Sequence, residues 1–226
     1  LPDVLKACIQ RFPAGSLQFE VGIQTFNPEV QALISRKQDN AKSIENLRWL
    51  RTSSTAHLHT DLIFGLPGED LASFAKGFDQ LVALRPHEIQ VGILKRLRGT
   101  PIIRHTDSFG MLYNPYPPYN ILATDRIDLF TMQQMNRFAR YWDLIGNSGR
   151  FEHSLQSLLG DEPFARFWVL SEHLHELSGQ THQIALPRLF KLVHEIALND
   201  LGLAEDFTEK MLADYARSGQ KGEIPF

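Results

Sequence analysis

The chain has 226 residues, 43% of them hydrophobic, which is enough to bury one sizeable core or two modest ones. Its formal charge of −3 and pI near 6.3 come from interspersed acids and bases, so no run of one sign predicts a nucleic-acid surface. No apolar stretch is long enough to cross a bilayer, and the amino end lacks the regions of a signal peptide, which predicts a soluble, cytoplasmic protein.

The amino end has apolar residues at helical spacing from its first positions, namely Val4, Leu5, Cys8 and Ile9. Because the pattern begins in mid-helix and without a methionine, we expect an excised segment. Cys8 is the only cysteine, so the chain can form no internal disulfide and no cysteine-rich metal site. A small buried hydrophobic residue is the ordinary role predicted for it.

Helical and short apolar patterns alternate from residue 1 to about residue 103, which is typical of β/α units around a parallel sheet. Three strands are predicted over residues 17–24, 57–64 and 88–94. Asn27 and Pro28 predict the start of the first intervening helix, and Asp70 predicts the start of a helix that ends before Arg85-Pro86. A short helix between them is predicted to begin at Asn40 or Ser43 and to run through Arg51.

The pattern changes after Thr100-Pro101. Residues 113–119 contain tyrosines and prolines and predict a stiff connector, packed against the protein. Beyond it we expect helices over 123–144, 150–159, 163–177, 186–199 and 204–216, with glycines near their ends. The predicted domains are 1–105, 106–122 for the connector and 123–226 for a helical C-terminal domain.

Each predicted strand has one apolar and one polar face, because successive side chains alternate. The polar faces carry Gln18, Glu20, Gly22 and Gln24; His57, His59 and Asp61; and Glu88, Gln90 and Gly92. This pattern fits a sheet covered by helices on one side and lining a wet or ligand-filled cavity on the other. The periodicity fits equally well a sheet whose polar face is merely hydrated.

The carboxyl ends of the predicted strands carry three motifs, and ligands of parallel β/α folds bind at such ends. The first, Gly22-Ile-Gln24-Thr-Phe-Asn27, continues to Arg36, which is expected about two turns down the next helix. Gln24 suits a ribose hydroxyl pair and Arg36 suits a carboxylate, although a lone arginine on a helix is more often solvated. The second is Asp61-Leu-Ile-Phe-Gly65-Leu-Pro-Gly68-Glu69, whose glycines let the backbone approach a ligand, and the third is residues 94–100. For Glu69 we prefer an interaction with the helix dipole.

In order and spacing, these motifs resemble the fourth, fifth and sixth strands of radical S-adenosylmethionine enzymes. The segment from Gln24 to Arg36 is especially similar to the oxygen-independent coproporphyrinogen oxidases. That resemblance implies that Gln24 binds the ribose of S-adenosylmethionine and Arg36 its carboxylate, that Asp61 lines the same site, and that the Gly65-Leu66-Pro67-Gly68 turn flanks the adenine. The cofactor-binding residues it implies are Gln24, Arg36, Asp61, Gly65, Leu66, Pro67 and Glu20.

The family's CxxxCxxC loop, which holds a 4Fe-4S cluster, has no counterpart in this sequence. We therefore expect the C-terminal part of a partial β/α barrel, inactive alone, that binds a small-molecule substrate together with a missing N-terminal part of the same polypeptide. The resemblance implies S-adenosylmethionine and the cluster as cofactors and assigns this chain no catalytic residue and no metal ligand. It implies neither a nucleic-acid nor a membrane partner.

The remainder of the chain, with Tyr113–Tyr119 and Asn147–Phe151, resembles a helical domain that follows the barrel in cobalamin-binding radical enzymes, some of them magnesium-protoporphyrin monomethyl ester cyclase-like. This resemblance adds cobalamin, bound by a domain outside this sequence, to the implied cofactors. Two other interpretations stay open. One is a β/α-barrel hydrolase or lyase using Asp61, His59 and Glu20, and the other is a helical partner-binding module on a barrel scaffold.

Overall fold

The structure of the protein is a computed structural model that describes residues 1–204, 206–220 and 224–226. It divides into two compact units, Leu1–Gln133 and Gln134–Phe226, which are described in turn. The division falls inside a helix and later than the aromatic connector, and the domain ranges 1–105, 106–122 and 123–226 stay a prediction.

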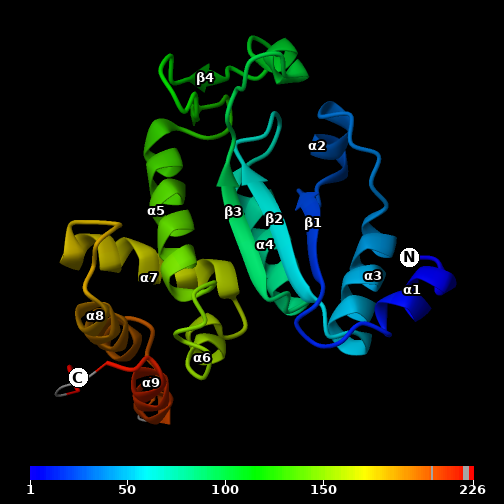
Figure 1. Cartoon of the computed structure of the whole chain (residues 1–226). Helices are drawn as coiled ribbons and strands as arrows, with labels where there is room; N and C mark the ends of the chain where they lie inside the picture. Colours follow the sequence, from blue (N-terminus) through cyan, green and yellow to red (C-terminus); the bar gives the residue numbers. More distant parts are fainter. Residues whose placement is uncertain (205, 221–223) are drawn as a thin grey trace. The chain divides into compact units, whose positions relative to one another are not determined.

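The first unit is built on a three-stranded parallel sheet, as predicted, and its strand order is β1-β2-β3 (Figure 1). Its strands are β1 (Gln18–Gln24), β2 (His57–Phe64) and β3 (Glu88–Ile93), and its helices are α1 (Asp3–Ile9), α2 (Pro28–Leu33), α3 (Asn40–Ser53) and α4 (Leu71–Ala83). The chain is therefore a mixed α/β protein, at the coarse level that the sequence predicts.

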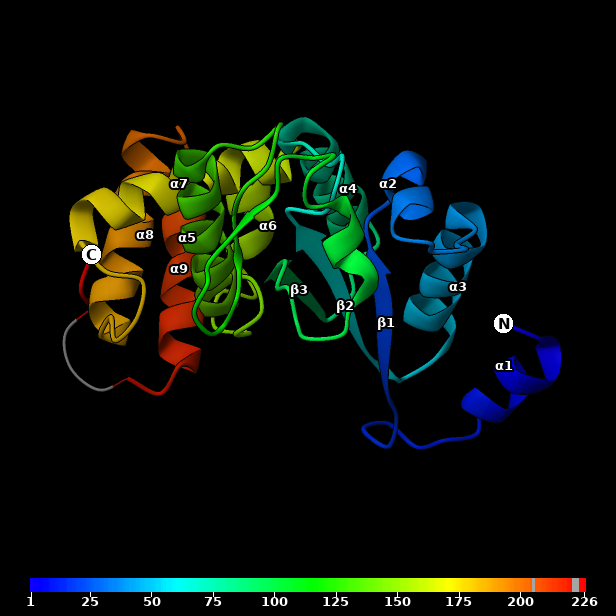
Figure 2. The same ribbon diagram turned by 90° about the horizontal axis from the view of Figure 1, so that it is seen from above.

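Helices cover the apolar face of this sheet. Helix α4 lies on one side of the strands, as Figure 2 shows, and the ring of its Phe74 meets that of Phe64 edge-on at 5.1 Å. At the other end of the face, Ile9 of α1 and Leu50 of α3 pack with Leu58 in one buried cluster. Burying these side chains supplies the main stabilisation of the unit.

The first helix corrects one expectation. Cys8 is exposed and Ile9 is the buried residue of α1, so the predicted buried role of the cysteine is wrong. The helix has only 7 residues, and only one position of its last turn faces the core.

The helix starts of this unit follow local capping chemistry. The side chain of Asn27 accepts hydrogen bonds from the backbone N–H groups of Glu29 and Val30, and that of Asp70 accepts one from Ser73, which confirms both predicted caps. Helix α3 begins at Asn40, with Asp39 as its cap, and extends two residues past the predicted end at Arg51.

The aromatic connector folds into a short antiparallel pair, β4 (Leu112–Tyr113) and β5 (Ile121–Ala123), beyond a 3-10 helix η1 (Pro101–His105). The backbone N–H of Ile121 donates to the carbonyl of Leu94, so the pair is attached to the end of β3. The predicted helix over 123–144 is wrong at its start, because Ala123 is in β5 and Thr124 forms a turn that accepts from the N–H groups of Arg126 and Ile127. Helix α5 (Leu129–Ile145) follows.

The second unit holds most of α5 and the helices α6 (Leu155–Leu159), α7 (Pro163–Ser178), α8 (Leu186–Asn199) and α9 (Asp206–Arg217). Helices α7 and α8 match the predicted 163–177 and 186–199 to within one residue. Helix α6 begins later than the predicted 150–159 because His153 and Ser154 donate to Asp214 before the helix starts. The predicted helix over 204–216 includes Glu205, which lies outside the described residues.

Aromatic side chains fill the core of the second unit. Phe138 stacks on Phe164, and Phe151 stacks on Phe190 with ring centroids 4.5 Å apart. Arg137 and Glu172 form a largely buried ion pair between α5 and α7. Over the described residues, no helix combines the length and the apolar character that spanning a bilayer requires.

Candidate functional site

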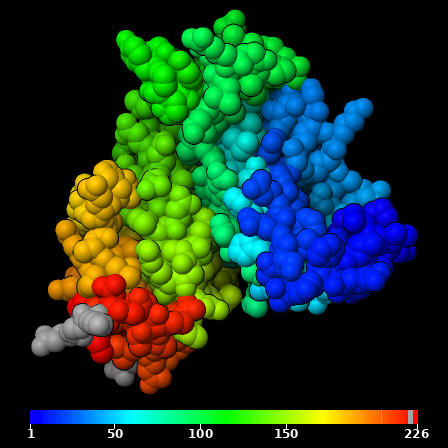
Figure 3. Space-filling model, viewed as in Figure 1, coloured from blue at the N-terminus to red at the C-terminus, as the bar shows by residue number. Residues whose placement is uncertain are grey.

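The polar face of the sheet is open at the surface of the first unit. Residues of β2 alternate between fully buried and half-buried, with His57, His59 and Asp61 on the accessible side, as predicted. Figure 3 shows atoms of β2, in cyan, at the surface beside the blue atoms of β1. A cavity of about 240 Å³ opens there, lined by Glu20, Val21, Gly22, His59, Thr60, Asp61 and Gln90.

Strand register places the ionisable groups of this cavity. Glu20 lies opposite His59, and Gly22 lies opposite Asp61 on the neighbouring strand. On the other side, Asp61 pairs in register with Gln90 of β3. The sheet thus brings Glu20 and Asp61, both predicted as site residues, into one polar cavity.

The carboxyl of Asp61 is electrostatically perturbed by its surroundings. Burial raises the pKa of its carboxyl above the ordinary value, while a hydrogen bond from the Ile23 N–H and the charges of Arg36 and His59 act in the opposite direction. The Ile23 nitrogen lies 3.1 Å from Oδ1. A carboxylate that is partly desolvated yet close to a guanidinium is typical of ligand-binding and catalytic sites.

Arg36 also lies beside the carboxyl end of β1, but in a backbone conformation that the sequence did not predict. Helix α2 ends at Leu33, and Ser35 adopts φ +58°, so Arg36 lies in the loop after the helix and not two turns down it. The N–H groups of Ser35 and Arg36 bond the carbonyls of Ala32 and Gln31, which reverses the chain. The Arg36 guanidinium then donates to the carbonyl of Gly22.

Gly22 is where Arg36 and Asp61 converge. A Cβ built on this glycine would lie 3.3 Å from Asp61 Oδ1 and 3.6 Å from an Arg36 Nη atom. The backbone there must therefore pass close to both side chains, which a glycine allows. The structure brings together Arg36, Asp61 and the carboxyl end of β1.

Gln24 occupies a strained position beyond this convergence. Its φ is +63°, in the left-handed region that non-glycine residues rarely adopt, and the register of β1 with β2 slips between Gly22 and Gln24. The residue is half-buried and does not line the 240 Å³ cavity. Its predicted contact with a ribose stays a prediction.

The Gly65-Leu66-Pro67-Gly68 turn is buried beneath the β4–β5 pair. A Cβ on Gly65 would lie 2.6 Å from the side chain of Ile121, and Leu66 is 3% exposed. Arg126 donates to the carbonyl of Gly68. The close approach that the glycines permit is, in this chain, an approach to the protein's own side chains, and the predicted adenine contact stays a prediction.

A buried contact between Thr25 and Glu69 joins the carboxyl ends of β1 and β2, and the sequence did not reveal it. The Thr25 hydroxyl donates to Glu69 Oε2 at 2.6 Å, and both residues are buried. Asp70 caps α4 and Glu69 directly precedes it, so the expected interaction of Glu69 with the helix dipole stays a prediction. The sequence offered only one sign of this contact, namely that Thr25 and Glu69 each lie in the motif that follows a strand, and the two residues are 44 positions apart.

The described residues offer no cluster of three or more His, Cys, Asp or Glu side chains placed to hold a metal ion. Cys8 lies on α1, and its thiol has no second cysteine to act with. An iron–sulfur cluster needs several thiolates, so the residues of this chain do not fit one.

Several curated relatives are oxygen-independent coproporphyrinogen III oxidases. Those of Synechocystis sp. and Escherichia coli K12 are each 34% identical over 77 residues, which cover 34% of this chain and 16% and 17% of theirs. The chain therefore spans less than a fifth of these relatives' length. The solved coproporphyrinogen III oxidase HemN of Escherichia coli, described as a radical SAM enzyme, is 25% identical with a TM-score of 0.41, over 55% of this chain and 26% of that one.

The C-terminal part of the chain matches a different family. Residues 107–226 fit the family described as a protein of unknown function, DUF4080. This match begins just after η1, includes the β4–β5 pair and extends to the last residue. The chain belongs to the DUF4080 family.

Proposed function

We propose that this chain is part of a radical S-adenosylmethionine enzyme and contributes side chains to the site of that cofactor. The observation that carries the proposal is the convergence of Arg36 and Asp61 on Gly22 at the carboxyl end of the sheet. The relatedness to coproporphyrinogen oxidases, one of them described as a radical SAM enzyme, supports it.

The groups at this edge fit part of such a cofactor. The planar fork of Arg36 suits the methionyl carboxylate, the Gln24 amide suits the ribose hydroxyls, and the Asp61 carboxylate suits a cationic or hydrogen-bond-donating group. All three are half-buried, so each is partly accessible to a ligand. In this role the chain binds and orients the cofactor and holds no reacting atom of its own.

The cluster thiolates would come from residues outside this sequence, since the chain has one cysteine. S-adenosylmethionine bound beside a reduced iron–sulfur cluster supplies hydrogen-abstraction chemistry in enzymes of this kind. We expect the 226-residue chain alone to be inactive and to bind the cofactor weakly. A CxxxCxxC motif encoded upstream of Leu1 would support this view, and a natural chain that begins near Leu1 would contradict it.

Several finer expectations belong to the same proposal and rest on the sequence alone. They are a partial barrel followed by a helical domain, a link to cobalamin, a magnesium-protoporphyrin monomethyl ester cyclase-like relationship, a small-molecule substrate, and a soluble, cytoplasmic protein. The helical domain of the proposal lies within residues 107–226, the region that fits DUF4080.

The proposal is tested by ligand-detected NMR of the chain with S-adenosylmethionine. We expect saturation transfer that indicates weak, millimolar-range binding and that disappears in Arg36→Gln, because the carboxylate loses its planar partner. The matched control is Lys37→Gln, which removes an exposed neighbouring charge and should leave the signal unchanged. Micromolar affinity, no transfer at all, or equal signals in both variants would contradict the proposal.

A second candidate, acid–base catalysis by a barrel hydrolase or lyase, is favoured by the register of Glu20, His59 and Asp61 in one cavity and by the raised pKa of Asp61. It gives no role to Arg36. If this candidate is correct, His59→Gln should abolish hydrolysis of a chromogenic ester panel by this chain and Arg36→Gln should not. If the wild-type chain leaves every ester of the panel intact, the candidate fails.

A further inference from the structure

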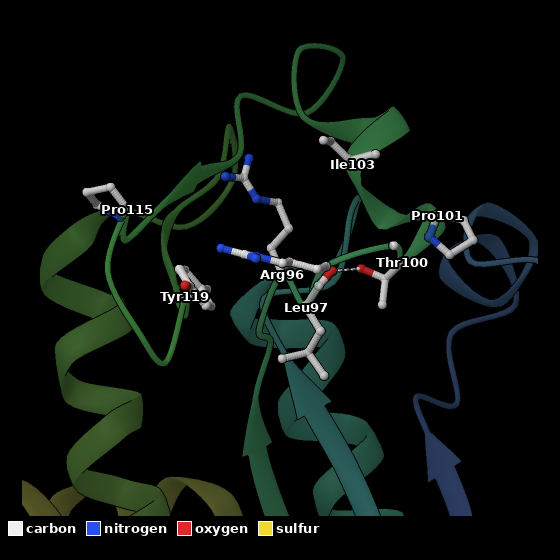
Figure 4. A pocket seen from close by; sticks show the side chains of 9 residues that line it. Arg96, Leu97, Thr100, Pro101, Ile103, Pro115 and Tyr119 are labelled. Atoms are coloured by element: carbon white, nitrogen blue, oxygen red, sulfur yellow. Dashed lines mark hydrogen bonds between the residues drawn. The ribbon is translucent and has the colours of Figure 1, made fainter.

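A second, larger cavity lies at the carboxyl end of β3, outside the predicted site. Its volume is about 720 Å³, which is the size of pockets that hold drug-sized ligands. Figure 4 shows its two sides, with the loop after β3 and η1 on one and the segment between β4 and β5 on the other. It is lined by Arg96, Leu97, Arg98, Gly99, Thr100, Pro101, Ile103, Pro115 and Tyr119, and we call it the Arg96 pocket.

The Arg96 pocket is positively charged within an acidic chain. From residue 89 to residue 106 the sequence has Lys95, Arg96, Arg98 and Arg104 and no Asp or Glu, although the formal charge of the whole chain is −3. Among the described residues, no carboxylate forms an ion pair with Arg96 or Arg98. Two arginines that line one pocket without an ion-pair partner attract an anion.

The guanidinium of Arg96 is also held in place. Its Cζ lies 4.9 Å from the centre of the Tyr113 ring, so the ring supports the planar group from one side. Arg104 differs from it, because its guanidinium donates to the carbonyl of Leu33 and to Ser35, away from the pocket. The cationic character of the pocket therefore comes from Arg96 and Arg98.

The remaining wall is apolar and unusually accessible. Leu97 is 56% exposed and Ile103 is 60% exposed, and Pro101, Pro115 and Tyr119 continue the same lining. Apolar side chains that surround two cations provide surface for a ligand with both an anionic group and an apolar body.

The backbone around the pocket is fixed. The N–H of Arg96 donates to the carbonyl of Tyr119, and that of Thr100 donates to the carbonyl of Leu97. Tyr119 has φ +58°, a conformation that costs an aromatic residue free energy and persists only where its surroundings hold it. A pre-formed lining lowers the ordering cost of binding.

We propose that the Arg96 pocket binds an organic anion, namely a carboxylate or phosphate carried on an apolar or aromatic body. The guanidinium groups of Arg96 and Arg98 bind the anionic group, and Leu97, Ile103 and Tyr119 contact the body. This site goes beyond the proposed function, because it uses none of the residues assigned to S-adenosylmethionine and needs no cluster.

The test uses three naphthalene probes of similar shape: 2-naphthoate, 2-naphthyl phosphate and the neutral 2-naphthalenemethanol. Titrations followed by amide NMR shifts should show both anions, or one of them, binding about tenfold more tightly than the alcohol. A preference between the two anions identifies the carboxylate or the phosphate as the natural group. The shifted amides should be those of the non-proline residues in 95–103, together with Tyr116 and Tyr119.

Variants assign the effect to side chains. Arg96→Gln and Arg98→Gln should each weaken anion binding about tenfold and leave the alcohol unchanged, whereas Leu97→Ala should weaken all three probes. Arg48→Gln, on the exposed side of α3, is the matched charge control and should change nothing. Arg36→Gln should also leave these titrations unchanged, so a failure of the cofactor proposal and a failure of this one are distinguishable. Equal binding of anions and alcohol, no binding, or anion binding insensitive to both pocket variants would overturn the proposal.

Discussion

Asp61 combines two opposing influences on one carboxyl group. Burial disfavours its charged form, and this effect outweighs the Ile23 N–H and the positive charge of Arg36, so the pKa of the carboxyl is raised. In the folded protein the Asp61 carboxyl therefore keeps its proton at pH values where the same group of the unfolded chain has released it. This aspartate then reduces the free energy of unfolding as the pH rises from the ordinary aspartate pKa through the raised one.

NMR titration of the aspartate carboxyl carbons tests this directly. Asp61 should titrate above the ordinary value, and Asp39 should titrate below it, because the backbone N–H of Lys42 stabilises the Asp39 carboxylate. In unfolding experiments over that pH window, the free energy of unfolding should fall less with rising pH in Asp61→Asn than in the wild-type chain. An Asp61 that titrates at or below Asp39 would show that the Ile23 N–H and the neighbouring positive charges together dominate over burial.

At the scale of secondary-structure elements, Asp214 joins two helices of the second unit. Its buried carboxylate on α9 accepts from the N–H groups of His153 and Ser154, at 3.0 and 2.9 Å, and from the Ser154 hydroxyl at 2.7 Å. These bonds satisfy backbone donors just before α6, where the cap residue has no side-chain bond of its own.

Removing this carboxylate should destabilise the second unit strongly. We expect Asp214→Ala to lower the free energy of unfolding by about 3 kcal/mol, because it leaves buried donors unsatisfied, and Asp214→Asn to cost less because one acceptor oxygen remains. Urea unfolding followed by circular dichroism measures both. Asp206→Asn is the control: its exposed pair with Lys210 should contribute less than about 1 kcal/mol. Similar losses for Asp214→Ala and Asp206→Asn would contradict this role.

Elements whose signals are local could be predicted, and those that depend on distant partners could not. Strand β2 matches its predicted limits, and Asn27 and Asp70 cap their helices, because alternation and capping involve neighbouring residues. The β4–β5 pair was missed because these two short strands, which flank a proline-rich segment, are stabilised by a hydrogen bond to Leu94, directly after β3. The end of α2 was missed because Ser35, and not a glycine, takes the left-handed conformation.

The same distinction holds for the candidate site. Strand alternation was enough to place Glu20, His59 and Asp61 on one face, which the burial pattern and register confirm. It could not show that Arg36 returns to Gly22 or that Glu69 is buried against Thr25, because both contacts depend on loops that fold back across the sheet edge. The Arg96 pocket likewise needs two segments about 20 residues apart in sequence to be packed together.

At the scale of the whole molecule, the division into two compact units predicts that a destabilising substitution in one unit raises local unfolding in that unit and not in the other. Gly65→Ala should destabilise the first unit, because φ at this position is +90° and the added methyl would lie 2.6 Å from Ile121. Asp214→Ala should destabilise the second unit. Hydrogen exchange measured by mass spectrometry should therefore rise in β2, β3 and α4 for the first variant, and in α6, α8 and α9 for the second.

Gly15→Ala is the control, with φ +80° but open space around the added methyl, and should raise exchange less than Gly65→Ala does. If either Gly65→Ala or Asp214→Ala accelerated exchange equally in both sets of elements, the units would unfold as one, and Gly65 and Asp214 would support a single cooperative structure.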